Sequence, residues 1–279
     1  MHINKSIVHF GFSNTDFTYQ IYQPQGDDKV LVDFYCEVLF SPDSANLFTR
    51  AILPFPGCEL VFYLHGEAKT TIHETEEAIL SKSYLFGQPS ITRKFQVSPG
   101  ARIFVVRIKQ HLFKSFLHDY TNWQDRIFPL QEIAGEDSWA LFSQLNKTQS
   151  FEDNISIAQQ AMARLINKKP DENFQWLQTI EGAIPDNTSV ARLAKRTHIT
   201  IRQLERQFNT YFDLTPQEYL RLKKLANALD HYARSPNTSV TDASYIGGFA
   251  DQAHFIKTFR FYSPLAPFRF FRNYNIKKH

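Results

Sequence analysis

Hydrophobic residues follow two different periods along this chain, and the change comes after Lys109. Before that residue, short segments rich in β-branched and aromatic residues alternate with groups of Gly, Pro, Ser and Asp, a pattern typical of strands joined by turns. Many short strands at this spacing predict a small β-sandwich or barrel. The expected strands are Val30–Phe40, Glu59–Leu64, Ala68–His73, Tyr84–Phe86, Ile91–Val97 and Arg102–Ile108.

After Lys109 the apolar residues are spaced as on one face of a helix. The run Asn-Lys-Lys-Pro-Asp at 167–171 is the expected connection between two domains. We therefore expect an α+β protein, with a β-rich domain at residues 1–110, a helical linker segment at 111–170 suited to dimerisation, and an all-α domain at 171–279. The expected helices are His111–Tyr120, Asp137–Leu145, Ile155–Asn167 and Glu172–Glu181.

One pattern occurs twice in the all-α part. Residues 189–208 match residues 239–259 at an offset that is first 50 and then 51. Each copy reads as two short helices joined by a tight turn, which is the helix-turn-helix pattern, and one additional residue near the second helix of the second copy explains the changed offset. The matching pairs are Ser189 and Ser239, Val190 and Val240, Ala194 and Ser244, Ile199 and Phe249, Leu204 and Phe255, Arg206 and Lys257, Phe208 and Phe259, and Pro216 and Pro267.

Helix start signals are explicit in this region. Thr215-Pro216-Gln217-Glu218 is a capping box with proline at the first helical position, so a helix is expected to run from there towards His231. The run from Ser239 to Asp242 is a weaker start signal, and Asp251 suits the N-cap of the following helix. The long helix from Thr215 would lie between the two units and set their separation.

Charge is divided unevenly along the chain. From Asp186 to the end there are 15 Lys and Arg against 7 Asp and Glu, whereas the preceding residues hold 16 and 21. A basic C-terminal third beside an acidic remainder favours a nucleic-acid-binding part joined to a part that does not touch nucleic acid. The chain has only two cysteines, too few for a disulfide framework. No apolar run has the length and flanks of a signal peptide or a membrane span, so we expect a cytoplasmic protein without membrane contact.

In a helix-turn-helix, the second helix presents its N-terminal half to base edges in the major groove. In the first unit, Thr200 is expected to cap this helix, and Arg202, Gln203, Glu205 and Arg206 are the expected DNA-facing residues. Arg202 and Arg206 lie four apart, hence on one face, and suit guanine or phosphate. Glu205 either accepts a hydrogen bond from cytosine or pairs with one of these arginines.

In the second unit, the expected DNA-facing residues are Gln252, Ala253, His254 and Lys257. Gln252 suits adenine, Ala253 suits a thymine methyl group, and Lys257 suits phosphate or guanine. His254 either faces the groove or packs beside Phe255.

Three motifs in this region have fixed spacings: L-A-x(9)-L-E-R-x-F from Leu193, L-T-P-x-E-Y from Leu214, and G-F-x-D-Q-x-H-F-x(3)-F from Gly248. With them, residues from about 171 to 279 resemble the DNA-binding domain of the AraC/XylS transcription regulators. The resemblance implies seven helices, a linker helix between the units, and recognition helices in successive major grooves on one face of the DNA. The resemblance also places Arg202, Glu205 and Arg206 at the family's base-facing positions in the first recognition helix. The base-facing positions of the second recognition helix correspond to Gln252, Ala253, His254 and Lys257.

Three positions depart from the family pattern, which usually has glycine where this chain has His198, Asp213 and Pro264. His and Asp adopt positive φ at modest cost, but proline cannot. The turn at Ser263-Pro264 is therefore expected to follow another path, which puts the closing helix after Pro267 in doubt.

The N-terminal strands, with P-G-C-E-L-V-F from Pro56 and R-I-F-V-V-R-I from Arg102, resemble the cupin-like domains that precede many such regulators. Glu59, Tyr63 and His65 alternate onto one strand face, and with Arg107 they could line a ligand pocket. The alternative is a solvent-exposed face or an internal Glu–Arg pair. Because the sequence lacks a His-x-His pair, and His65 and His73 are eight residues apart, we expect no metal and no cofactor.

The expected function is therefore binding rather than catalysis: a sequence-specific regulator of transcription that reads two major grooves, with an effector acting on its β-rich domain. Two other classes stay open, a ligand-free protein-interaction regulator and a cupin-type metalloenzyme with a DNA-binding appendage. Double-stranded DNA is the expected partner, and a small-molecule effector, a second copy of the chain and RNA polymerase are further candidates.

Overall fold

The computed structural model describes residues 17–43, 47–72, 76–109, 123–166, 180, 184, 188–234 and 239–273. The helix expected at His111–Tyr120, the connection expected at 167–171 and all but Ile180 of the helix expected at Glu172–Glu181 lie outside these residues. The same holds for His73 at the end of an expected strand.

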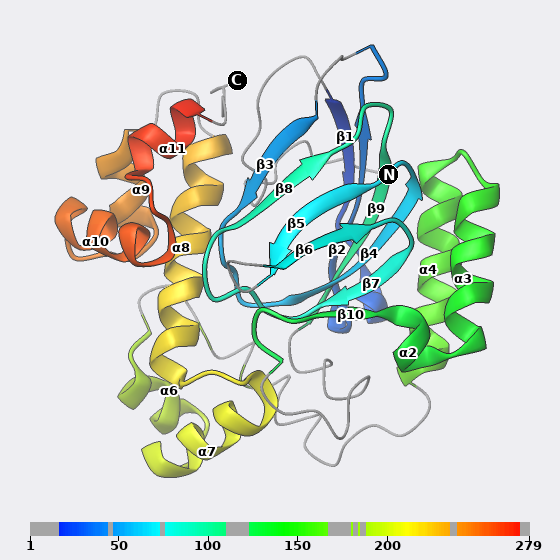
Figure 1. Ribbon diagram of the computed structural model, residues 1–279. Helices are drawn as coiled ribbons and strands as arrows, with labels where there is room; N and C mark the ends of the chain where they lie inside the picture. The colour runs from blue at the N-terminus through cyan, green and yellow to red at the C-terminus, as the bar shows by residue number, and fades with distance from the viewer. Residues whose placement is uncertain are drawn as a thin grey trace.

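Two antiparallel sheets make up the N-terminal part (Figure 1). The larger sheet has the order β1-β2-β9-β4-β7-β10 and the smaller one has the order β3-β8-β5-β6. A short 3-10 helix, η1, spans Gly26–Val30. The strands are β1 (Phe17–Tyr22), β2 (Val32–Phe40), β3 (Phe48–Ile52), β4 (Cys58–His65), β5 (Ala68–Ile72), β6 (Glu76–Leu80), β7 (Ser83–Phe86), β8 (Arg93–Val97), β9 (Arg102–Ile108) and β10 (Ile127–Pro129).

The central strands β4 and β9 are buried on both faces, which explains their apolar runs Leu60–Leu64 and Ile103–Val106. Alternate residues such as Val61 and Val105 pack in the core between the two sheets. Their neighbours Phe62 and Phe104 lie in a second core on the outer face of the larger sheet. The predicted two-sheet β-domain is confirmed by this arrangement.

Several strand boundaries differ from the predicted ones. The strand predicted to begin at Val30 begins at Val32, because residues 26–30 form η1. The strand predicted to begin at Ile91 begins at Arg93, because the Thr92 amide binds a carbonyl outside the sheet. Strands β1, β3, β6 and β10 were not predicted. Of these, β3 and β10 pair with strands that are distant in the chain, β8 and β7.

Three helices follow β10 and cover the outer face of the larger sheet, where Figure 1 shows α3 and α4 side by side. They are α2 (Leu130–Ala134), α3 (Glu136–Lys147) and α4 (Phe151–Ile166). The helices predicted at Asp137–Leu145 and Ile155–Asn167 therefore exist, although α4 begins four residues earlier, at Phe151. Phe151 packs edge-on against Phe104 of β9, which ties the start of α4 to the sheet.

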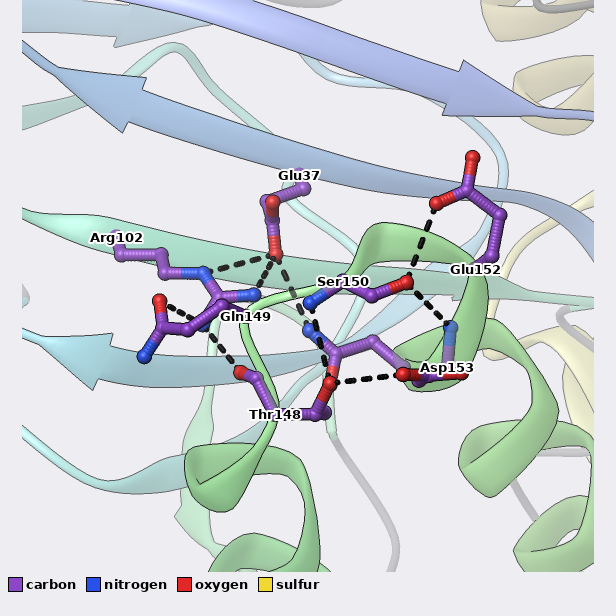
Figure 2. A network of polar contacts seen from close by, with 8 residues as sticks. Glu37, Arg102, Thr148, Gln149, Ser150, Glu152 and Asp153 are labelled. Carbon is purple, nitrogen blue, oxygen red and sulfur yellow. Dashed lines mark hydrogen bonds and ion pairs between the residues drawn. The ribbon is translucent and has the colours of Figure 1, made fainter.

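A buried polar network also joins these helices to the sheet (Figure 2). Nε and Nη2 of Arg102 on β9 donate to Glu37 Oε1 on β2 at 3.0 and 2.8 Å, and Nδ2 of Asn154 on α4 donates to the same oxygen at 3.1 Å. Nη1 of Arg102 donates to the Thr148 carbonyl at 2.6 Å, in the loop between α3 and α4. One guanidinium therefore orients the helix pair on the sheet.

The C-terminal part is all helical among its described residues and shares one core that includes Leu204, Phe208, Leu225, Phe255 and Phe259. Its helices are α6 (Val190–Arg196), α7 (Ile201–Phe212), α8 (Pro216–Arg234), α9 (Val240–Ile246), α10 (Gln252–Tyr262) and α11 (Pro267–Asn273). Figure 1 shows α6 with α7 near one end of α8, and α9 with α10 near its other end.

Candidate nucleic-acid interface

The two helix pairs, α6 with α7 and α9 with α10, start with the same local chemistry. The Ser189 hydroxyl accepts a hydrogen bond from the Arg192 amide at 3.2 Å, and the Ser239 hydroxyl accepts from the Asp242 amide at 3.0 Å. Asp242 completes a capping box by accepting from the Ser239 amide at 3.1 Å. The repeated serine of the sequence pattern is therefore a helix N-cap in both copies.

The turns of the two units also match, bond for bond. The Ile199 amide donates to the Ala194 carbonyl at 3.1 Å, and the Phe249 amide donates to the Ser244 carbonyl at 3.0 Å. His198 has φ 55° at the place in the first turn where Gly248 has φ 82° in the second. His198 thus adopts the left-handed conformation that was expected of it.

The predicted departures at the ends of the recognition helices are also seen. Asp213 caps α7 with φ 51° and ψ 33°, a left-handed conformation. After α10 the C-cap is Ser263, which is extended, with φ −132° and ψ 135°, as a residue before proline prefers. Pro264, which stands where Asp213 does in the first unit, cannot take the positive φ of Asp213. The path differs as expected, but the closing helix α11 does form, from Pro267 to Asn273.

On α7, the expected DNA-facing side chains of Arg202, Gln203, Glu205 and Arg206 are all exposed. Thr200 is the N-cap, and Gln203 Oε1 accepts from the Thr200 amide at 2.9 Å, so these two residues form a capping box. Sequence reasoning missed this role of Gln203, although the spacing Thr-x-x-Gln signals it. No ion pair joins Glu205 to Arg202 or Arg206 among these described side chains.

On α10, the side chains of Gln252, Ala253, His254 and Lys257 are exposed as well. Asp251 is the N-cap, with its Oδ1 accepting from the His254 amide at 2.7 Å. The Thr241 hydroxyl donates to Gln252 Oε1 at 3.0 Å, which links α9 to the start of α10. The His254 ring lies edge-on to Phe249, with ring centroids 5.3 Å apart.

The close approach of α9 to α8 depends on Gly247. A Cβ atom at this position would lie 2.5 Å from the Ala228 Cβ and 2.8 Å from the Lys224 carbonyl oxygen. Only glycine therefore allows the second unit to pack on the long helix as it does.

Comparison with known proteins agrees with this geometry. The family model HTH_18, described as a helix-turn-helix domain, matches residues 193–273. These residues form an AraC-family helix-turn-helix domain. The HTH-type transcriptional activator RhaS of Escherichia coli strain SE11 is 36% identical over 84 residues, which is 30% of each chain. RhaS of Enterobacter sp. strain 638 is 35% identical over 86 residues, 31% of each chain, so the match spans under a third of these relatives.

Solved structures similar to this chain include ToxT from Vibrio cholerae O395, with 13% identity over 92% of this chain and 97% of that one and a TM-score of 0.47. A cupin_2 domain of an XRE-family transcriptional regulator from Enterobacter cloacae covers 34% of this chain and 97% of its own, with 14% identity and a TM-score of 0.27.

Away from the AraC-family domain, two of the four candidate ligand residues, Glu59 and Tyr63, lie at a small cavity between the sheets. The cavity measures about 60 Å³. Burial raises the pKa of Tyr63 above its usual range, so its phenol stays neutral. Arg107 donates from Nε to Glu59 Oε1 at 2.9 Å, and the Phe55 and Phe34 rings lie against its guanidinium.

The internal Glu–Arg pair left open as an alternative is therefore what the structure contains. His65 does not join this set, because the strand pairing is irregular between Tyr63 and His65, and His65 is exposed. No group of three His, Cys, Asp or Glu residues within the described ranges could hold a metal ion. None of the described helices has the length and apolar character to cross a membrane.

Proposed function

We propose that this protein is a sequence-specific DNA-binding regulator of transcription. The observation that carries the proposal is the repeated unit, in which two recognition helices, α7 and α10, each present exposed polar side chains from the same positions. An AraC-family domain that matches transcriptional activators over 84 residues supports it. Since the partner is DNA, we propose that the protein acts by binding rather than catalysis, and in the cytoplasm.

Roles for single residues follow from side-chain chemistry. We assign guanine or phosphate contacts to Arg202 and Arg206, which share one exposed face of α7. Gln252 suits adenine, since its amide nitrogen can donate while its oxygen also accepts from Thr241. Lys257 suits phosphate or guanine.

The remaining residues complete the two reading surfaces. Ala253 offers a methyl group to thymine, and His254 and Glu205 are exposed at the margins. Thr200 and Gln203 shape the helix start that faces the DNA backbone.

Selection of bound sequences from random DNA tests the proposal directly. A reproducible site with two half-sites in successive major grooves is the expected result. On that site, Arg206→Ala should weaken specific binding by about 1–3 kcal/mol. Arg164→Ala, which removes an exposed arginine of α4, is the matched control and should leave affinity unchanged. Failure to enrich any sequence over random DNA would refute the proposal.

The domain limits, the effector and the other partners remain predictions. We also propose a division into a β-rich domain at residues 1–110, a linker segment at 111–170 and a DNA-binding domain at 171–279. The cavity of about 60 Å³ is well below the roughly 300 Å³ of a typical small-molecule site, so any effector held there without rearrangement is very small. The exposed Trp139 on α3 supports the proposed contact with a second copy.

A further inference from the structure

The β-domain and the helix-turn-helix units share a core through β3. Ala51 and Leu53, at the end of β3 and just after it, are 0% and 2% exposed and belong to the core of the C-terminal helices. Phe48 and Ile52 of the same strand pack instead in the core between the two sheets. Figure 1 shows β3 and its neighbour β8 beside α8. One segment is therefore part of both cores.

A second contact lies at the carboxyl end of α10, the second recognition helix. The carbonyl of Tyr262, its last residue, accepts from the Thr92 amide at 2.8 Å and from the Thr92 hydroxyl at 2.9 Å. Carbonyl groups in the last turn of a helix have no partner within the helix. The loop before β8 supplies that partner.

A third contact lies at the carboxyl end of α7, the first recognition helix. Asp213, its C-cap, accepts from the Gln124 amide through Oδ2 at 3.4 Å. Gln124 lies in the turn 123–126 that precedes β10. The β-domain thus touches both recognition helices at the same end, the one opposite their N-caps.

The two contacting segments, 88–93 and 123–126, are held together, and we call them the bracket. Asp125 Oδ1 accepts from the Ser90 amide at 2.7 Å, and the Asp125 carbonyl accepts from Arg93 Nη2 at 2.6 Å. Gly87, just before the first segment, approaches the second so closely that a Cβ on it would lie 2.1 Å from the Trp123 carbonyl oxygen. A movement of one segment therefore moves the other.

We propose that the bracket and Leu53 position α7 and α10 relative to each other, so that both can enter DNA at once. This rests on the proposed DNA-binding function. The bracket leaves the expected DNA-facing residues exposed, so its contacts do not block the surfaces that would bind DNA. Two linked units bind one DNA more tightly when their relative pose is fixed beforehand, because less freedom is lost on binding.

The test variant is Leu53→Ala with Thr92→Val in the full chain, which trims the shared core and removes the Thr92 hydroxyl. The matched control is Leu80→Ala with Thr70→Val. Leu80 is a buried leucine of the core between the sheets, and the Thr70 hydroxyl also donates to a carbonyl, that of Lys94, at 2.9 Å. Both variants are compared at a temperature where their circular dichroism equals that of the wild type.

Affinity is measured on three duplexes: the selected site, and the same site with either half-site scrambled. The affinity of the test variant for the complete site should fall roughly tenfold, which is a part of the 10²- to 10⁴-fold gain in affinity that linked binding can give. Its affinity for the two scrambled duplexes should stay unchanged. The control should match the wild type throughout.

Equal losses on all three duplexes, no loss, or tighter binding by the test variant would each overturn the positioning role. A wild-type chain without preference for any duplex would show instead that the proposed function itself is wrong.

Discussion

Removing the Arg102 cation is a sharp test of how the helices α3 and α4 are held on the sheet. In Arg102→Met the methionine side chain replaces the aliphatic stem of the arginine and lacks the guanidinium. Glu37, 4% exposed, therefore loses both guanidinium hydrogen bonds. Asn154 Nδ2 is then the partner that remains from the network of Figure 2. A buried carboxylate is left without a compensating charge.

The magnitude follows from the burial of both partners. Breaking a buried ion pair on one side costs about 3–5 kcal/mol, since the remaining charge stays desolvated. In the double variant Glu37→Gln with Arg102→Met no charge is left buried. The Thr148 carbonyl still loses its donor, so a loss of about 1–3 kcal/mol is expected there. The double variant should therefore be more stable than Arg102→Met alone.

Urea unfolding followed by circular dichroism measures these differences as shifts of the transition midpoint. Glu37→Gln alone completes the double-mutant cycle and isolates the coupling between the two side chains. The reasoning is refuted if Arg102→Met costs less than about 1 kcal/mol, or if the double variant is as unstable as the sum of the two single ones.

Three further predictions concern other parts of the molecule. Gly247→Val should destabilise the packing of α9 on α8 by about 1–3 kcal/mol, whereas Ala250→Val, at an exposed position, should have little effect on thermal unfolding. Burial raises the pKa of the Cys58 thiol, so iodoacetamide at pH 8 should label it only after unfolding. Because the folded pKa is the raised one, this thiol contributes stability below the unfolded pKa of about 8.5, and the contribution is lost as pH rises further. DNA affinity should fall linearly with salt concentration on logarithmic axes, and a flat response would contradict phosphate contact.

Local chemistry explains why the helix-turn-helix units could be predicted so fully. Ser189, Ser239 and Asp251 are N-caps because each side chain reaches an amide only three residues away. Pro216 and Pro267 begin helices because their fixed φ suits the first turn. Such interactions involve residues only a few positions apart, so they can be predicted from the sequence alone. Because the unit is repeated, the same capping pattern can be recognised at two places.

The sheets were less predictable because their partners are distant in the chain. Strands β2, β9 and β4 were visible as apolar runs, but their order in the sheet was not. The irregular pairing after Tyr63 removed His65 from the face that simple alternation gives it. A local pattern does not record where a ladder shifts by one residue.

By itself, the sequence determined the two reading units, their capped helices and the presence of a β-rich domain in front of them. Only the tertiary structure decided that Ala51 and Leu53 belong to the helical core, and that Thr92 and Gln124 meet the ends of the two recognition helices. The reason is physical: a cap is made between neighbours in the chain, whereas the Gln124 and Thr92 contacts join residues 89 and 170 positions apart, and only the folded chain brings them together.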